Sequence, residues 1–115
     1  MADPLYTTKL NGDWRNAIEG RLTAIEADEW SPLGGPKMQQ RVIEVVGRAL
    51  DLAGEWEELH GHAPDVDFVS EEIHKLANNK YSPGSERSRQ LNKNAQDLFI
   101  LAARDVTGIP AQKQR

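Results

Sequence analysis

The sequence has no cysteine and few aromatic residues, and each shortage limits the kinds of fold and site that the chain can form. Without cysteine among its 115 residues, the chain forms no disulfide bond and offers no thiolate metal ligand. Aromatic residues make up 6% of the chain and hydrophobic residues as a whole 38%. A single small chain with so little apolar material builds a thin core, so we expect copies of it to form a homo-oligomer through shared apolar faces.

Long hydrophobic runs and targeting signals are also missing. No apolar run approaches the roughly 20 residues that a membrane-spanning helix needs. The start of the chain, Met1-Ala2-Asp3-Pro4, lacks the basic region and apolar core of a secretory signal, so we expect a cytoplasmic protein. No segment alternates strictly between apolar and polar residues, and no repeat indicates a solenoid. The predicted fold class is therefore all-α.

The chain has no surplus of positive charge. Its net charge of -4 argues against general nucleic-acid binding, because a basic face usually supplies most of that affinity. The charge is unevenly spread, however: residues 1–69 carry 13 acidic and 6 basic side chains, a net charge of -7, whereas residues 70–115 carry 5 acidic and 8 basic ones, a net charge of +3. The first part suits a basic partner surface and the second a small anion.

Apolar residues recur at helical spacing in the first half of the chain. They predict helices over about residues 13–28 and 36–60, separated by a loop rich in proline and glycine, so that residues 13–62 hold two N-terminal helices. Residues 1–12 show no period and are predicted to form an arm that packs late or frays. The stripe of the second helix reaches Leu59 and is broad, which indicates a central helix or an oligomer interface.

The second half of the chain repeats the helical spacing. Helices are predicted over about residues 66–78 and 85–107, so that residues 65–108 form a C-terminal helical hairpin and residues 109–115 a polar tail. With the first two helices this gives four, in a chain of ordinary single-domain length. We therefore expect one small four-helix domain, assembled into an oligomer through the long second helix or the hairpin.

The turn of the predicted hairpin is rich in cations. Pro83 and Gly84 favour a tight turn, and Ser85 can cap the helix that follows. The free amides and the dipole of such a helix start suit an anion. The cations are expected to hold phosphate groups and a tyrosine to stack on a base; the candidate residues are Lys80, Tyr81, Ser85, Arg87, Arg89 and Lys93. The alternative interpretation is a capped turn with solvated surface charges.

Residues 82–106 also carry a recognisable pattern: a proline-containing turn, then Glu86-Arg87-Ser88, Leu91, Lys93 and Phe99 with alanines behind it. This pattern resembles the helical-hairpin domain of phage anti-defence proteins that sequester cyclic-nucleotide immune signals. The resemblance implies an oligomeric protein in the host cytoplasm that binds a second messenger without catalysis or a cofactor. Because the first 62 residues have no counterpart, it assigns no binding residue.

Glu55 and Glu58, followed much later by Asp97, suggest a different function. Their arrangement looks like the magnesium-binding pattern of all-α nucleotide pyrophosphohydrolases, in which acidic helices hold Mg²⁺ against a triphosphate. Asn94 stands where that family has a glutamate. Three carboxylates alone leave the metal short of ligands, so the resemblance implies at most a degenerate enzyme.

Two Glu-x-x-His patterns, Glu57 to His60 and Glu71 to His74, match the spacing found in di-iron helical bundles. Such a site also needs inward-facing glutamates on other helices, and the candidates are Glu26, Glu29 and Glu44. The alternative is that the histidines are exposed residues at a helix end. Because no complete ligand set is present, we expect no metal centre.

The function predicted from these observations is binding without catalysis. No serine or threonine lies in a strand-to-helix elbow that would activate it as a nucleophile. The leading hypothesis is sequestration of a small phosphate-containing ligand, such as a nucleotide immune signal, at the cationic turn. The alternative is a protein-binding inhibitor or adaptor whose acidic helices dock on a basic partner such as a host defence protein.

Overall fold

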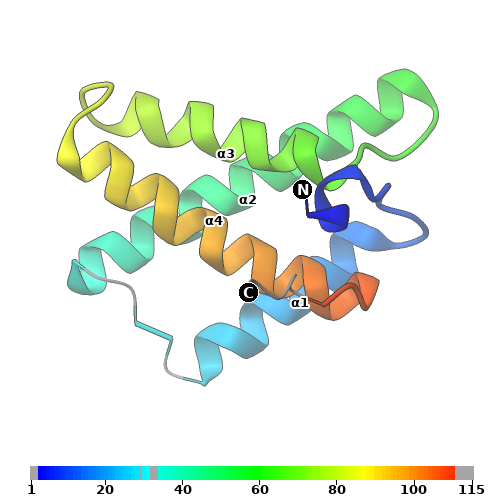
Figure 1. Ribbon diagram of the computed structural model, residues 1–115, viewed down its shortest axis with the longest axis horizontal. Coiled ribbons are helices and arrows are strands. Elements are labelled where there is room, and N and C mark those ends of the chain that lie inside the picture. The colour runs from blue at the N-terminus through cyan, green and yellow to red at the C-terminus, as the bar shows by residue number, and fades with distance from the viewer. Residues whose placement is uncertain (1–2, 29, 32–33, 111–115) are drawn as a thin grey trace.

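The computed structural model describes residues 3–28, 30–31 and 34–110 (Figure 1). No strand forms in these residues; one isolated antiparallel bridge joins Lys9 to Asp65. The predicted all-α class is confirmed, and each predicted helix boundary lies within two residues of the observed one. The elements in chain order are the 3-10 turn η1 (Pro4–Thr7), α1 (Trp14–Ala27), α2 (Gly35–His60), α3 (Val66–Lys80) and α4 (Glu86–Thr107).

Local capping signals fix the starts of the two hairpin helices. The Ser85 side-chain oxygen accepts a hydrogen bond from the Ser88 amide at 3.2 Å, which confirms the predicted cap of α4. Asp65 caps α3 in the same way, through the amide of Phe68 at 3.0 Å. At the other end of α4, Gly108 adopts a left-handed conformation with φ of 73°, which glycine tolerates without steric cost.

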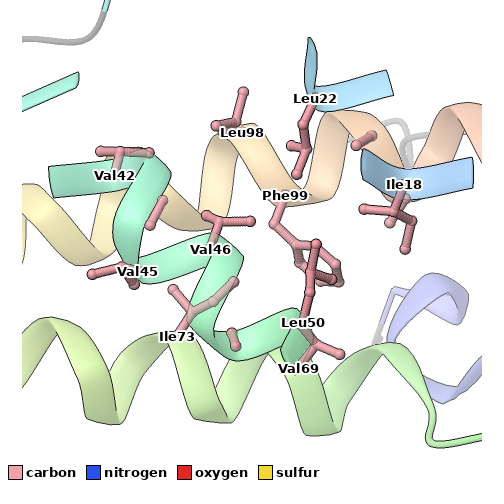
Figure 2. Close-up of a cluster of buried hydrophobic side chains, with 14 of the residues drawn as sticks. Ile18, Leu22, Val42, Val45, Val46, Leu50, Val69, Ile73, Leu98 and Phe99 are labelled. Atoms are coloured by element: carbon pink, nitrogen blue, oxygen red, sulfur yellow. The ribbon is translucent and has the colours of Figure 1, made fainter. Parts of the chain in front are cut away.

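The helices pack in an order that leaves one neighbouring pair apart. α3 and α4 run side by side as the predicted hairpin, α2 packs against both, and α1 lies along α4 on the side away from α3 (Figure 1). The backbones of α1 and α2 come close at few points, although the two helices are consecutive in the chain, and the side chains of Trp14 and Arg15 bridge them. Figure 2 shows the core side chains converging from all four helices; among them are Ile18, Leu22, Val42, Val45, Val46, Leu50, Val69, Ile73, Leu98 and Phe99.

The prediction that the arm of residues 1–12 frays is wrong for the described residues 3–12. Leu5 and Leu10 are buried in the core, and η1 packs against α3 and α4. The Leu10 amide donates a hydrogen bond to the Pro64 carbonyl at 2.9 Å, so the segment is also tied to the loop before α3. Four residues of 3-10 helix are too few to produce a periodic pattern, which is why the sequence did not reveal this packing.

The apolar stripe of α2 ends earlier than the sequence predicts. The helix is buried as far as Ala53, whereas Leu59 near its end is 83% exposed. Among the described residues, no helix combines the length and the apolar character needed to cross a bilayer. In the predicted tail, the carbonyl groups of Ile109 and Pro110 accept hydrogen bonds from Arg104, and residues 111–115 lie outside the described residues.

Candidate functional site

The structure does not gather the predicted ligand residues at the hairpin turn. Lys80 points to α2, where its Nζ lies 3.4 Å from Glu44 Oε2. Hydrogen bonds from Arg41 and then Lys80 hold the pKa of Glu44 below its usual value. Tyr81 is half-buried against the core, so part of its ring is already covered. Two of the six candidates are therefore engaged within the domain.

Arg89 and Lys93 lie on one exposed face of α4 and are each paired with an acid of the same helix. Arg89 contacts Glu86 at 3.1 Å, and Lys93 contacts Asp97 at 2.8 Å. Arg87 lies about 200° around the helix from Arg89, because successive helical residues turn by about 100°. One small anion therefore cannot contact both arginines in this arrangement. The geometry is that of solvated surface charges.

The Arg87 side chain and the free amides at the start of α4 are the groups of the turn that remain available to a ligand. Arg87 is exposed and forms no hydrogen bond or ion pair with any described residue. The Ser85 cap engages the amide of Ser88, and the Ser85 carbonyl accepts from Arg89 at 3.0 Å. The earlier amides of α4, those of Glu86 and Arg87, have no partner within the helix, as at any helix start.

The acidic residues that suggested magnesium do not form a metal centre in the described part of the chain. No group of three or more histidine or carboxylate side chains there has a metal-binding arrangement. Asp97 pairs with Lys93 on the exposed face of α4. Asn94 is nearly buried, with interactions of its own. Glu55 and Glu58 lie on α2 and line a hollow between α1 and α2.

Residues of both Glu-x-x-His patterns have other partners, among them His74, whose Nε2 lies 3.1 Å from Asn78 Nδ2. Glu57 accepts a hydrogen bond from Trp14 Nε1 at 3.2 Å, which ties the start of α1 to the end of α2. His60 bonds through Nδ1 to the Trp56 carbonyl at 2.8 Å and stacks on the Trp56 indole, with ring centroids 4.0 Å apart. Glu29 lies outside the described residues. The histidine is thus an exposed helix-end residue, as the alternative interpretation holds.

The fold does gather charge at a different place, between the start of α1 and the last turns of α2. A shallow hollow of about 460 Å³ lies there. We call it the acidic hollow, and its charged lining consists of Asp13, Asp51, Glu55, Glu57 and Glu58 with Arg15 and Arg48. These carboxylates come from two segments far apart in the sequence, so the chain alone predicted only their summed charge.

The carboxylates of the acidic hollow are only partly neutralised. Arg15 forms ion pairs with Asp51 and, at 3.2 Å, with Glu19. Glu55 and Glu58 are exposed and have no hydrogen bond or ion pair in the described part of the chain. Glu58 lies in the last turn of α2, where the helix dipole disfavours its negative charge by about 0.3–1 kcal/mol. A cation placed in the hollow would offset that cost.

A groove of about 340 Å³ with a mixed polar and apolar lining lies further along the same two helices. Its lining combines the buried side chains of Leu22, Val46, Leu50 and Leu98 with those of Glu19, Thr23, Glu26 and Ile43. Ile43 is 40% exposed. Gly47 also lines the groove, and a Cβ atom added to it would meet nothing within 4 Å. The groove and the acidic hollow lie end to end between α1 and α2, and together we call them the α1/α2 seam.

Comparison with known proteins gives no relative from which a function can be transferred. No protein-family model, no curated protein and no solved structure matches this chain. The resemblance to the anti-defence hairpin therefore rests on residues 82–106 alone. The choice between the cationic turn and the acidic hollow depends on their geometry.

Proposed function

We propose that this chain is a non-enzymatic adaptor or inhibitor that docks on a basic surface of another protein through the acidic hollow. The observation that carries the proposal is the meeting of five carboxylates, four from α2 and one from Asp13 just before α1, with two arginines to balance them. Opposite charge across an interface speeds the encounter and fixes the orientation of the partners. This is the alternative to ligand capture that the sequence suggests, and it has the better-assembled site.

The hollow also has an apolar neighbour suited to an interface. Leu59 lies one turn beyond Glu55 on α2 and is 83% exposed. Protein interfaces combine apolar anchors with a charged rim that excludes water around them. Arg15 shows which group the hollow accommodates, because its guanidinium already pairs with Asp51 there. A lysine or arginine of the partner would find Glu55 and Glu58 unpaired.

Binding of a fluorescein-labelled oligolysine peptide, followed by anisotropy at low ionic strength, tests the proposal. The double variant Glu55→Lys/Glu58→Lys should weaken binding at least about tenfold, since it replaces the unpaired carboxylates. The matched control, Glu71→Lys/Asp105→Lys, changes the net charge equally at exposed positions outside the hollow. Equal losses in the two variants would mean that net charge alone attracts the peptide, and the docking function would then be wrong.

A second candidate function is the capture of a small phosphate-containing ligand, such as a nucleotide immune signal, at the cationic turn. The observation that favours it is the unpaired Arg87 in the first turn of α4. A phosphate there would gain the helix-start amides and a guanidinium, and several turns brought together in an oligomer would add to this. The resemblance of residues 82–106 to the anti-defence hairpin supports the same ligand class.

A thermal-shift screen against cyclic dinucleotides, cyclic trinucleotides and ADP-ribose derivatives tests ligand capture. A ligand present at 100 times its dissociation constant should stabilise the fold by about 2.7 kcal/mol. The variant Arg87→Ala/Arg89→Ala should abolish that shift and leave oligolysine binding unchanged. A flat screen in the wild-type protein contradicts ligand capture.

We also propose that the protein forms a homo-oligomer and is located in the cytoplasm. The exposed apolar side chains of Leu59 and Leu101 support self-association, since burying them between copies would enlarge a thin core. Multi-angle light scattering across a range of protein concentrations tests it. A monomer at every concentration would contradict the homo-oligomer while leaving the docking function intact.

A further inference from the structure

Aromatic and histidine rings meet at the surface, at the corner between α2 and α3. The Trp56 ring is stacked on that of His60, with centroids 4.0 Å apart. The rings of His62 and Phe68 lie 5.0 Å and 5.4 Å from the same indole, and none of the four side chains is fully buried. The whole chain has only seven tryptophan, tyrosine and phenylalanine residues. Because aromatic rings contribute most when they are buried, placing two of so few at the surface indicates an interface.

A pocket of about 280 Å³ lies against this ring cluster, and we call it the aromatic pocket. Residues 63–65 of the loop before α3 form part of its lining. The other lining residues are Trp56, His62 and Phe68 of the ring cluster and the charged residues Lys9, Asp67 and Glu71. Pockets for small molecules usually measure about 300–1,000 Å³. The aromatic pocket is therefore better matched to one side chain than to a nucleotide or a cofactor.

Backbone contacts fix the loop that lines the aromatic pocket. The Pro64 carbonyl accepts a hydrogen bond from the Leu10 amide at 2.9 Å, and the Val66 amide donates one to the Thr8 carbonyl at 3.0 Å. Gly61 turns the chain out of α2 in a left-handed conformation with φ of 75°, which glycine tolerates without steric cost. The pocket is thus formed by the fold itself, so a ligand needs to order little of the loop when it binds.

The charges of the aromatic pocket favour a cation. The carboxylates of Asp67 and Glu71 form no hydrogen bond or ion pair with any residue that the structure describes, whereas Asp65 caps α3. The faces of aromatic rings carry partial negative charge and attract cations. Lys9 supplies the opposing charge, but its side chain is exposed and can turn into solvent.

A guanidinium group combines the properties that these walls select. It is planar, stacks on aromatic faces and forms forked hydrogen bonds with a carboxylate, whereas the lysine ammonium group is compact and strongly hydrated. We propose that the aromatic pocket binds an arginine side chain of the partner protein, with the guanidinium against Trp56 and paired with Asp67. The pocket and the acidic hollow lie at the same end of α2, so one basic surface can occupy both. That the arginine belongs to a protein rests on the proposed docking function, but the preference for arginine does not.

Two labelled peptides of equal length and charge, oligoarginine and oligolysine, test the proposal by anisotropy at low ionic strength. The wild-type protein should bind oligoarginine at least about fivefold more tightly, the ratio that one cation–π contact supplies. Trp56→Leu keeps an apolar side chain and removes the ring. It should abolish this ratio and leave oligolysine binding, which depends on the hollow, unchanged. Glu55→Lys/Glu58→Lys should weaken the binding of both peptides and preserve the ratio.

Asp67→Asn provides a second measurement if circular dichroism shows that Trp56→Leu alters the fold. It should lower the ratio of oligoarginine to oligolysine affinity, whereas Asp105→Asn, which changes the charge equally at an exposed position of α4, should not. Equal binding of the two peptides by the wild type, or an unchanged ratio in either folded variant, would overturn the proposal. If oligolysine binding still depends on Glu55 and Glu58 in that case, the docking function of the acidic hollow stands and only the arginine pocket fails.

Discussion

The hairpin helices α3 and α4 and the consecutive helices α1 and α2 are both pairs of neighbours in the chain, yet they use their surfaces differently. α3 and α4 pack along each other, begin at well-capped ends and pair exposed cations such as Arg89 and Lys93 with acids of the same helix. The backbones of α1 and α2 come close at few points, and their starts have no side-chain cap hydrogen bond; Trp14 and Arg15 bridge the two helices through Glu57 and Asp51. The paired charges of α4 stay within the hairpin, whereas the exposed and unpaired Glu55 and Glu58 of α2 are available to a partner.

The largest expected effect separates the closely packed part of the molecule from the seam. Phe99 is fully buried at the centre of the core, so Phe99→Ala should lower the free energy of unfolding by about 3–5 kcal/mol. Ile43 on the rim of the groove is 40% exposed, and Ile43→Ala should cost less than about 1 kcal/mol. Urea denaturation followed by circular dichroism measures both. Similar losses in the two variants would mean that the seam is part of the core.

The next effect concerns the helix starts. Ser85→Ala removes the hydrogen bond to the Ser88 amide and should destabilise the protein by about 1 kcal/mol. Asp13 occupies the corresponding position before α1 without making such a bond, so Asp13→Ala should cost less than about 0.5 kcal/mol. The same denaturation experiment measures the pair. A greater loss in the Asp13 variant would reverse the comparison of the two helix pairs.

A pH-dependent effect tests the attachment of the N-terminal segment to the hairpin. The Arg104 guanidinium, together with the Leu5 amide, holds the pKa of Asp3 below its ordinary value. A carboxyl whose pKa is lowered by folding stabilises the protein above its unfolded pKa, and that stability is lost as pH falls through the lowered value. The melting-temperature difference between wild type and Asp3→Asn should therefore be constant near neutral pH and shrink in acid. A difference that does not change with pH would show that the ion pair contributes nothing.

The smallest effect is expected from the exposed pairs of α4. Lys93→Ala removes an i,i+4 pair with Asp97 and should cost about 0.3–0.5 kcal/mol, a loss that added salt reduces. Arg87→Ala removes no pair and should leave stability unchanged, which makes it the control. Denaturation at low and high ionic strength measures the difference. A larger, salt-independent loss in the Lys93 variant would mean that this face is more than solvated surface.

Periodicity and capping residues predicted most of the fold. The four helices and the cap at Ser85 depend on neighbouring residues, so the sequence could reveal them. The packing of Leu5 and Leu10 depends on contacts with distant segments and on a short 3-10 turn, which leave no periodic signal. The exposure of Leu59 was missed for a related reason, because the apolar stripe continues past the point where α2 loses its neighbours.

Less of the candidate site than of the fold could be predicted from the sequence. One relevant signal is present in it: a helical rotation of about 100° per residue places Arg87 and Arg89 on different faces of α4. The pairing of Lys80 with Glu44 and the meeting of Asp13 with Glu58 in one hollow depend on how helices pack, which the chain alone does not state. Net charge over residues 1–69 pointed to the acidic part of the molecule, and tertiary structure was needed to locate the hollow within it.

An NMR titration of the isotopically labelled protein with the oligolysine peptide tests the central claim most directly, because it shows where a basic partner binds. We predict that the largest amide shift changes fall around the acidic hollow, on residues 13–16 and 48–58. Changes centred on residues 80–93 at the hairpin turn, or weak changes spread over the whole surface, would contradict the claim that the acidic hollow is the docking site.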